Sequence, residues 1–246
     1  MTPKILTSIK QIPNLYISDR QGACDEPLLV EHGITHILTI RRWEDDPNLA
    51  MTPITPPIKL PLIRKYVELE DDPTADLLAH LGEMVDWIHD ALSHKFDPKP
   101  RTETITGSVP VPPVQNAGSR VLVHCNQGIS RSGAVIIAYM MRTLEVDYKT
   151  ALSMAQQSRI LISPNFGFQY QLRLWRQCGF DVYDPADNEE QERKQGGGNS
   201  LLRPNATYRA WKNEVAEIFD SSEGCVFQRA KEEWLGGLQA KLDAMG

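Results

Sequence analysis

The sequence predicts an α/β fold in which helices flank a parallel or mixed sheet, and two observations support this prediction. Short runs of β-branched and apolar residues, each typical of a strand, alternate along the chain with longer segments of helical periodicity. One of these runs, residues 121–124, is short, apolar and β-branched, as expected of a central strand buried on both faces. The chain of 246 residues is long enough for one packed domain with appendages.

Three further strands are expected before this central one. Residues 14–18 and 35–40 are rich in Ile, Leu, Thr and Tyr, and Gly33 supplies a turn in front of the second run. Residues 58–63 are a third candidate. Pro61 indicates that this strand lies at an edge or ends there, because proline cannot donate a hydrogen bond to a neighbouring strand.

Helical segments alternate with these strands. In residues 74–95 apolar side chains recur every three or four positions. Asp72 followed by Pro73 predicts an N-cap with proline at the first helical position. Residues 133–144 are apolar on nearly all sides, which indicates a buried helix. Two further helices are predicted over residues 148–159 and 165–178.

Two irregular segments divide the chain. Residues 96–119 contain five prolines and are expected to form an exposed insert. Residues 184–200 are strongly charged and glycine-rich near their end, as in a linker. The predicted organisation is a domain over residues 1–183, this linker, and a helical C-terminal extension over residues 201–246. The extension is expected either to dock on the core or to bind a protein partner.

Bulk properties exclude several classes of function. A net charge of −6 and a pI near 5.6 disfavour a surface devoted to nucleic acid or anionic lipid. The longest apolar stretch, residues 134–141, is too short to cross a membrane, and the N-terminus lacks the apolar core of a secretory signal. The four cysteines lie far apart without a C-x-x-C pair, which argues against disulfides and a structural zinc site. We therefore expect an intracellular protein of the cytoplasm or nucleus.

The most informative stretch lies between the predicted central strand and the predicted buried helix. It reads H-C-N-Q-G-I-S-R-S, and we call its residues 125–131 the cysteine loop. A loop at this junction directs backbone N–H groups and the positive end of a helix dipole toward one point, which favours phosphate. Gly128 permits a tight turn, and Arg131 presents a planar fork for two phosphate oxygens. The predicted phosphate-binding residues are Asn126, Gln127, Gly128, Ile129, Ser130 and Arg131.

Cys125 at the start of the loop is the predicted nucleophile. The surroundings that bind phosphate also stabilise a thiolate, which can attack phosphorus in line. Ser132 is expected to donate a hydrogen bond that eases departure of the thiolate in a second step. His124 is expected to orient the loop through local hydrogen bonds rather than to act as a base. The alternative is an ordinary strand–loop–helix junction. This alternative is disfavoured because these residues occur together at fixed offsets, with a predicted strand before them and a predicted helix after them.

The motif H-C-x-x-G-x-x-R-S resembles the signature of the cysteine-dependent protein tyrosine phosphatase superfamily. Four other stretches resemble its dual-specificity branch in the same order, namely residues 14–17, 33–38, 70–77 and 163–172. The resemblance covers roughly residues 12–180 and implies a central mixed, mostly parallel sheet flanked by helices. It also implies chemistry without a metal ion or other cofactor, because thiolate, arginine and backbone amides supply what a metal centre supplies elsewhere.

The resemblance further implies an aspartate on a mobile loop that protonates the leaving oxygen and then activates water. Asp71 is the predicted acid, because it precedes Asp76 by five residues, the offset seen in the branch. Asp72 is the competing candidate, and its expected role is the helix N-cap. Asn165 resembles a polar residue that fixes the phosphate-binding loop, and a helix N-cap is again the alternative.

The predicted function is hydrolysis of phosphotyrosine and phosphoserine/threonine in proteins through a phosphocysteine intermediate. A second hypothesis keeps the fold but changes the substrate to a phosphoinositide, an inositol phosphate or an RNA 5′-triphosphate. Members with such substrates tend to carry extra Lys or Arg in the loop, whereas the variable positions here are uncharged. A third hypothesis is a phosphoprotein-binding scaffold, which the presence of both Cys125 and Arg131 disfavours.

Overall fold

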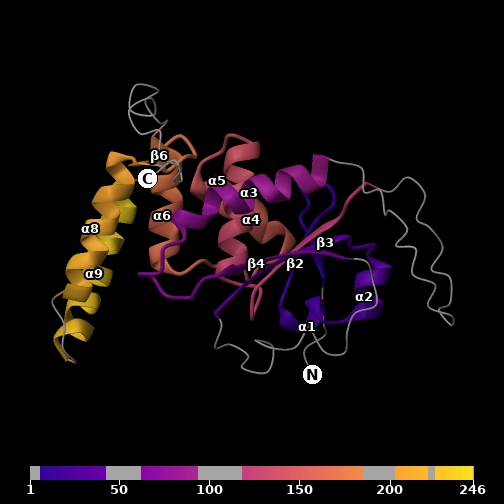
Figure 1. Cartoon of the computed structure of the whole chain (residues 1–246), viewed down its shortest axis with the longest axis horizontal. Helices are drawn as coiled ribbons and strands as arrows, with labels where there is room; N and C mark the ends of the chain where they lie inside the picture. The colour runs from indigo at the N-terminus through magenta and orange to yellow at the C-terminus, as the bar shows by residue number, and fades with distance from the viewer. Residues whose placement is uncertain (1–5, 43–61, 94–117, 185–202, 221–224, 246) are drawn as a thin grey trace, which may run out of the picture.

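The computed structural model describes residues 6–42, 62–93, 118–184, 203–220 and 225–245 (Figure 1). Nearly all of the expected linker and of the expected insert lies outside these residues. One helical layer and two short helices enclose a central sheet, and two long C-terminal helices lie beside the helical layer. The α/β class expected from the alternating pattern is therefore confirmed.

In the part of the chain that the structure describes, the main sheet has five strands in the order β1-β2-β5-β3-β4. Their bounds are β1 Thr7–Ser8, β2 Leu15–Ser18, β3 His36–Arg41, β4 Ile63–Glu68 and β5 Val121–His124. β1 pairs antiparallel with β2 and every other pair is parallel, so the sheet is mixed and mostly parallel, as predicted. β5 is central and buried at all four positions, as its apolar sequence indicates.

The third expected strand, residues 58–63, is misplaced. β4 begins at Ile63, where the expected strand ends, and residues 58–61 lie outside the described part of the chain. The strand escaped prediction because Arg64, Lys65 and Glu68 give it a polar sequence. β4 lies at the edge of the sheet, where strands tolerate charged side chains.

Six helices accompany the sheet in the part of the chain before the C-terminal extension that the structure describes. Their bounds are α1 Arg20–Ala23, α2 Glu26–Glu31, α3 Leu78–Ser93, α4 Arg131–Thr143, α5 Tyr148–Ser158 and α6 Phe166–Gln177. Alternate residues of β5 divide the core, because Val121 and Val123 join the large cluster with α3, α4 and α6, whereas Leu122 joins a smaller cluster with α1 and α2. The two clusters therefore lie on opposite faces of the sheet.

The start of α3 differs from the prediction. The helix begins at Leu78, so Asp72 is not its N-cap and Pro73 is not its first residue. The Asp72 carboxylate instead accepts hydrogen bonds from the backbone N–H and hydroxyl of Thr74 and closes a local turn. Asp76 covers the helix start, since its Oδ1 accepts from the Ala79 N–H at 3.0 Å. Residues 69–77 thus form a loop between β4 and α3, and we call it the acidic loop because it carries four acidic residues.

The C-terminal extension packs on α6. Its described part begins with β7 Arg203–Pro204, which pairs antiparallel with β6 Tyr183–Asp184 at the boundary between domain and linker, and continues with α8 Ala206–Asp220 and α9 Cys225–Ala244 (Figure 1). Tyr208, Trp211 and Leu238 are buried in the same cluster as the core of the sheet domain. Of the two expectations for the extension, docking on the core is the one observed.

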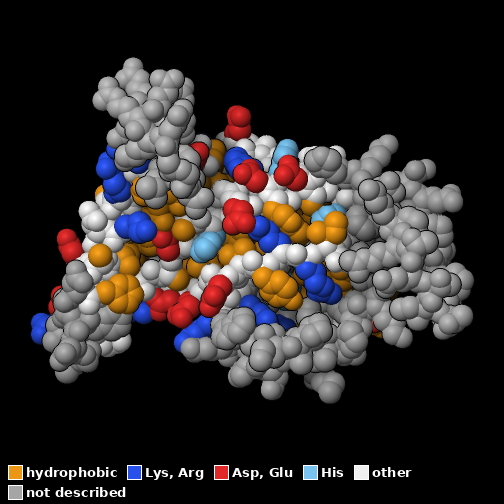
Figure 2. Space-filling view, viewed as in Figure 1, with side chains coloured by type: hydrophobic (Ala, Val, Ile, Leu, Met, Phe, Trp, Pro, Cys, Tyr) orange, Lys and Arg blue, Asp and Glu red, His pale blue; other side chains and the backbone are white. Residues whose placement is uncertain are grey.

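The surface shows no separation of charge on the face seen in Figure 2. Lys and Arg side chains are interspersed there with Asp and Glu among the described residues. None of the described helices is long and apolar enough to cross a membrane.

Candidate active site

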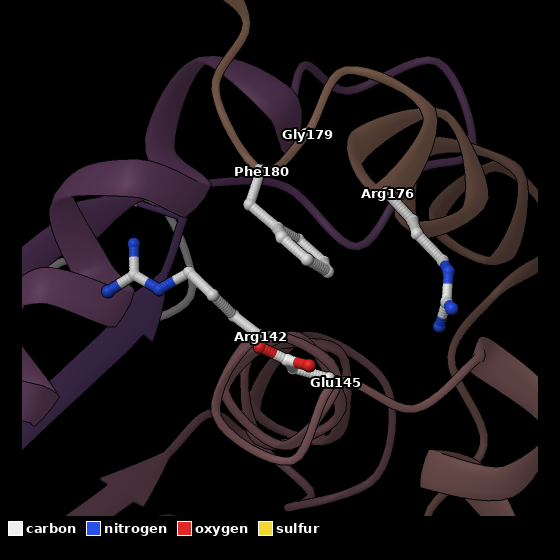
Figure 3. A pocket seen from close by; sticks show the side chains of 5 residues that line it. All are labelled: Arg142, Glu145, Arg176, Gly179 and Phe180. Atoms are coloured by element: carbon white, nitrogen blue, oxygen red, sulfur yellow. The ribbon is translucent and has the colours of Figure 1, made fainter.

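A pocket of about 630 Å³ opens at the C-terminal ends of α4 and α6 (Figure 3). It is lined by Arg142, Glu145, Arg176, Gly179 and Phe180. Arg142 follows Arg131 by eleven positions in α4, which corresponds to about 16 Å along the helix. None of these lining residues belongs to the cysteine loop, so this pocket is not the site that the motif predicts.

The cysteine loop lies at the opposite end of α4, between the C-terminal end of β5 and the first turn of that helix. Gly128 has φ +66°, and a Cβ at this position would lie 2.5 Å from the backbone oxygen of Ser18. A larger residue would therefore be strained in its backbone and would also collide with the end of β2. This close approach fixes the shape of the loop, as the glycine in the motif predicts.

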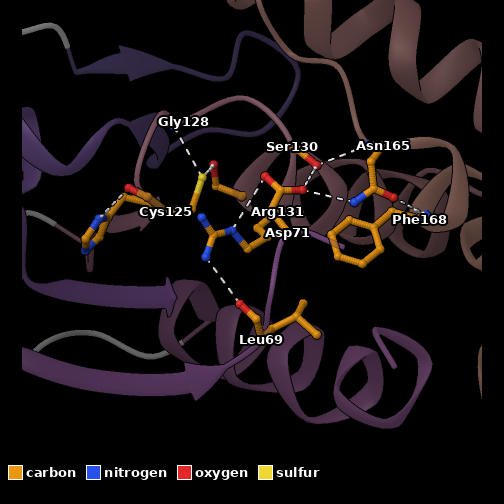
Figure 4. A network of polar contacts seen from close by, with 10 residues as sticks. Leu69, Asp71, Cys125, Gly128, Ser130, Arg131, Asn165 and Phe168 are labelled. Carbon is orange, nitrogen blue, oxygen red and sulfur yellow. Dashed lines mark hydrogen bonds and ion pairs between the residues drawn. The ribbon is translucent and has the colours of Figure 1, made fainter. Parts of the chain in front are cut away.

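Polar groups contact the sulfur of Cys125 (Figure 4). The Gly128 N–H donates to it at 3.3 Å, and the Ser132 hydroxyl lies 3.2 Å from it. The residue is only 2% exposed, so these two groups contact the sulfur at a site with little access to solvent. An N–H donor and a hydroxyl next to sulfur suit a thiolate better than an inert buried thiol.

The Arg131 side chain lies between the cysteine loop and the acidic loop. It is buried, its Nη1 donates to the Leu69 carbonyl at 3.2 Å, and its Nε lies 3.7 Å from Oδ2 of Asp71. These contacts restrict the guanidinium, which would reduce the entropy lost if it bound an anion.

Asp71 also contacts the cysteine loop, and Asp72 does not. Oδ1 of Asp71 accepts from the Ser130 hydroxyl at 2.6 Å and from Nδ2 of Asn165 at 3.0 Å (Figure 4). Asp72 instead bonds to Thr74 and to Nζ of Lys231, at 2.5 Å. Partial burial tends to raise the pKa of Asp72, but the hydrogen bonds from Lys231 and Thr74 outweigh it and lower that pKa below its usual value.

Asn165 caps α6 and also contacts the cysteine loop and the acidic loop. Its Oδ1 accepts from the Phe168 N–H at 2.9 Å and caps α6. Its backbone N–H donates to the Ser130 hydroxyl at 3.1 Å, and its Nδ2 reaches Asp71. One residue therefore fixes the first turn of α6, the cysteine loop and the acidic loop relative to one another.

The His124 side chain is buried and contacts the backbone of the cysteine loop at Cys125. Its Nε2 lies 2.8 Å from the Thr39 hydroxyl and its Nδ1 lies 3.3 Å from the Cys125 carbonyl. Burial lowers the pKa of His124 to about 4, with a smaller opposing effect from the hydrogen bond to Cys125. A neutral ring with its proton on Nδ1 satisfies both contacts, since Nε2 then accepts from Thr39.

The other predicted loop residues contribute mainly through the backbone. The Asn126 and Gln127 side chains are exposed, and Ile129 is half-buried. The Asn126 carbonyl accepts from the Arg20 N–H at 3.1 Å, and the Ile129 carbonyl accepts from the Ser163 N–H at 3.2 Å. Among the described residues, no group of three or more His, Cys, Asp or Glu side chains could hold a metal ion.

Two residues of this site escaped the sequence prediction. Arg159 donates from Nε to the Gly128 carbonyl at 3.0 Å and from Nη2 to the Gln127 carbonyl at 3.4 Å. A lone arginine at a helix end gives no signal of such a role. At Gly167 an added Cβ would lie 1.9 Å from the Pro73 oxygen, so α6 touches the acidic loop backbone there. This glycine follows Asn165 by two positions, and that spacing is the only signal the sequence offers.

A family model described as "Dual specificity phosphatase, catalytic domain" matches residues 109–178. The mouse serine/threonine/tyrosine-interacting protein is 33% identical over 164 residues, which are 66% of this chain and 61% of that protein. The Drosophila melanogaster dual specificity protein phosphatase MPK-4 is 31% identical over 171 residues, 70% of this chain and 36% of that protein. Human dual specificity protein phosphatase 12 is 29% identical over 223 residues, 91% of this chain and 55% of that protein. This chain therefore spans less than two thirds of each of these relatives.

Solved structures of phosphatases and phosphatase-like proteins also resemble this chain. The human tyrosine phosphatase-like serine/threonine/tyrosine-interacting protein matches with a TM-score of 0.53 at 26% identity, over 72% of this chain and 99% of that one. The Yvh1 phosphatase domain from Chaetomium thermophilum matches with a TM-score of 0.53 at 26% identity, over 75% and 100% of the two chains. A mouse putative dual specificity phosphatase, complexed with zinc tungstate, matches with a TM-score of 0.53 at 28% identity, over 72% and 89%.

Proposed function

The chain belongs to the dual-specificity branch of the cysteine-dependent protein tyrosine phosphatase superfamily, and we propose that it is a protein phosphatase whose nucleophile is Cys125. One observation carries the proposal. Asp71, Arg131 and the Cys125 sulfur are brought together from two loops by the contacts of Ser130 and Asn165. This is the combination that phosphate transfer to sulfur requires: a nucleophile, a cation for the phosphate and a carboxyl group for the leaving oxygen.

In the proposed first step the phosphate of the substrate binds to the N–H groups of the cysteine loop and to Arg131. The Cys125 thiolate attacks phosphorus, so that a phosphorus–sulfur bond forms while the bond to the substrate oxygen breaks. Asp71, protonated at this stage, donates its proton to the departing oxygen and becomes a carboxylate. The attachment of Asp71 to Ser130 supports this role, because it keeps the carboxyl group beside the loop that binds the phosphate.

In the proposed second step water hydrolyses the phosphocysteine. The Asp71 carboxylate accepts a proton from the water as its oxygen attacks phosphorus, and the phosphorus–sulfur bond breaks to release phosphate and the thiolate. Ser132 stabilises the departing sulfur by a hydrogen bond, which the 3.2 Å contact in the free protein supports. Asp71 thereby regains the proton that it donated in the first step.

The surroundings of the site favour a protein substrate. Ile160, Leu161 and Phe166 are exposed, by 76%, 55% and 53%, and belong to the segment that is bonded to the cysteine loop through Ser163 and Asn165. Exposed apolar side chains beside a polar site suit the ring of phosphotyrosine or the apolar neighbours of a phosphorylated residue. A polyanionic substrate would instead require cations in the cysteine loop, where Arg131 is the only Lys or Arg.

The proposal is tested by measuring phosphate release by the full chain from p-nitrophenyl phosphate and from matched phosphotyrosine and phosphothreonine peptides. We expect wild-type turnover on the aryl ester and on both peptides, no turnover by Cys125→Ser, and retained tungstate binding by that variant. Tungstate binding without hydrolysis of any substrate by the wild type would establish the scaffold hypothesis instead. Faster turnover of a phosphoinositide or of an RNA 5′-triphosphate than of both peptides would move the substrate class away from proteins.

A further inference from the structure

The three aspartates of the acidic loop have different partners. Asp71 contacts the cysteine loop, whereas the other two are bonded to the C-terminal extension. Oδ2 of Asp72 lies 2.5 Å from Nζ of Lys231 on α9, and Oδ2 of Asp76 accepts from the hydroxyl of Tyr208 on α8 at 2.6 Å. The loop that carries the proposed acid is therefore attached to both the cysteine loop and the extension.

The helices of the extension that make these contacts are held by packing against the hydrophobic core. Tyr208 and Trp211 are almost fully buried, and their rings stack at 6.1 Å with an interplanar angle of 14°. Leu238 of α9 is completely buried in the same core cluster. Asn205 caps α8, because its Oδ1 accepts from the Tyr208 N–H, and its Nδ2 donates to the Asp181 carbonyl. Moving Tyr208 would require part of the hydrophobic core to open.

The two contacts are also sheltered from solvent. The side chains of Lys231 and Asp72 are 19% and 29% exposed, so their attraction is screened less than that of a fully exposed pair. Burial, and next the hydrogen bond to Asp76, raise the pKa of Tyr208 above its usual value, so its hydroxyl remains a donor at any physiological pH.

We propose that Lys231 and Tyr208 are positioning residues that hold the acidic loop through Asp72 and Asp76, so that the C-terminal helices set the placement of Asp71 over the cysteine loop. The inference rests on the proposed role of Asp71 as general acid. It gives the extension a part in catalysis, although none of its side chains reaches the sulfur in the described structure.

The first test measures the loop directly and does not depend on activity. In the full chain, Lys231→Met and Tyr208→Phe each remove the contact to the acidic loop while keeping the apolar part of the side chain. In the double variant we expect amide hydrogen exchange in residues 70–77 to accelerate roughly tenfold or more, the scale for losing hydrogen bonds to charged groups. Exchange in the first turn of α4 should not change. Lys231→Arg should retain slow exchange, because a guanidinium can still reach Asp72.

Lys241→Met is the matched control. Lys241 lies on the same helix and pairs with Glu214 of α8 at 2.5 Å, within the extension and away from the acidic loop. It should leave exchange in residues 70–77 unchanged. Equal acceleration in the control and in the double variant, or no acceleration in either, would overturn the inference.

The second test compares phenyl phosphate, whose leaving group needs a proton, with p-nitrophenyl phosphate, whose leaving group needs one far less. We expect the Lys231→Met/Tyr208→Phe variant to lose kcat with phenyl phosphate by roughly fivefold to tenfold, below the ~10²–10⁴-fold limit for losing the acid itself. Turnover of p-nitrophenyl phosphate should change by less than about twofold, because the groups around Cys125 are untouched. A purely structural role would reduce both rates alike.

A third comparison separates this inference from the proposed function. In an Asp71→Asn background the double substitution should cause no further loss with phenyl phosphate, since the acid that it positions is already gone. An additional fivefold loss there would overturn the positioning role. A wild-type chain that hydrolyses neither ester refutes the proposed function instead, and the exchange measurement then still decides whether the extension holds the loop.

Discussion

Substitution of Gly167 should displace the proposed acid Asp71, because Gly167 lies at the contact between α6 and the acidic loop. A Cβ at this position would lie 1.9 Å from the Pro73 oxygen and 2.5 Å from the Pro73 carbonyl carbon. All three of the nearest atoms belong to the backbone of Pro73, so no side chain can rotate out of the way. In Gly167→Ala, therefore, either the acidic loop or the start of α6 has to move.

The size of the movement follows from the same distance. An ordinary carbon–oxygen contact needs about 3.3 Å, so the two segments must separate by somewhat more than ~1 Å. A shift of that size in the loop stretches the 2.6 Å bond between Asp71 and Ser130 beyond the range of a hydrogen bond. Misplacement of a reacting group by about 1 Å costs on the order of 10²-fold in rate. We therefore expect kcat with phenyl phosphate to fall about 100-fold.

The assay measures both aryl phosphates together with the thermal unfolding of each variant. Gly82→Ala is the control, because Gly82 lies inside α3 and an added Cβ meets nothing within 4 Å. Replacing glycine by alanine there should stabilise the helix by about 1 kcal/mol and leave both rates unchanged. A folded Gly167→Ala protein with wild-type turnover of phenyl phosphate would refute the reasoning. Equal losses with both esters would show that the damage reaches the cysteine loop.

Three further predictions concern single residues of the site. Asp71→Asn should slow turnover of phenyl phosphate by roughly 10²–10⁴-fold and Asp72→Asn by far less, and the reverse order in steady-state kinetics would show that the acid is misassigned. Arg159→Ala removes two hydrogen bonds to the cysteine loop and should lower kcat/KM for p-nitrophenyl phosphate about tenfold, whereas wild-type kinetics would exclude a bracing role. His124 has its pKa lowered to about 4 in the folded protein, so the unfolded chain binds more protons between pH 4 and 6.5. On acidification from pH 7.5 to 5, the free energy of unfolding measured in urea titrations should therefore fall by about 2 kcal/mol more for wild type than for His124→Gln. Equal decreases in the two proteins would contradict a buried neutral imidazole.

The cysteine loop could be predicted because its function is confined to consecutive residues. His124, Cys125 and Arg131 lie within eight positions at one strand–helix junction, and backbone geometry brings them together without any long-range contact. The central strand was predicted for a similar reason, since a strand buried on both faces is apolar at every position.

Features that depend on distant partners were harder to predict. The sequence places Asp71 and Asp72 side by side, but their partners lie 59 and 159 residues away. Nothing in the local pattern indicates that one carboxylate faces Ser130 while its neighbour faces Lys231. A distant partner also contributes to the start of α3, because the Leu78 N–H donates to the side chain of Gln171, 93 residues later.

Ser130 shows how the same contacts can serve both proposed steps. Its hydroxyl accepts from the Asn165 N–H and donates to Asp71. This arrangement fits an ionised Asp71, the form that accepts a proton from water in the proposed second step. In the first step Asp71 must instead carry a proton. A serine hydroxyl has two lone pairs and a freely rotating hydrogen, so Ser130 can then accept from both groups without moving its oxygen. An alanine would break the link, and a fixed donor such as an amide N–H would suit the carboxylate alone. On the proposed mechanism, a hydroxyl at this position therefore lets the acidic loop stay attached while Asp71 loses and regains its proton.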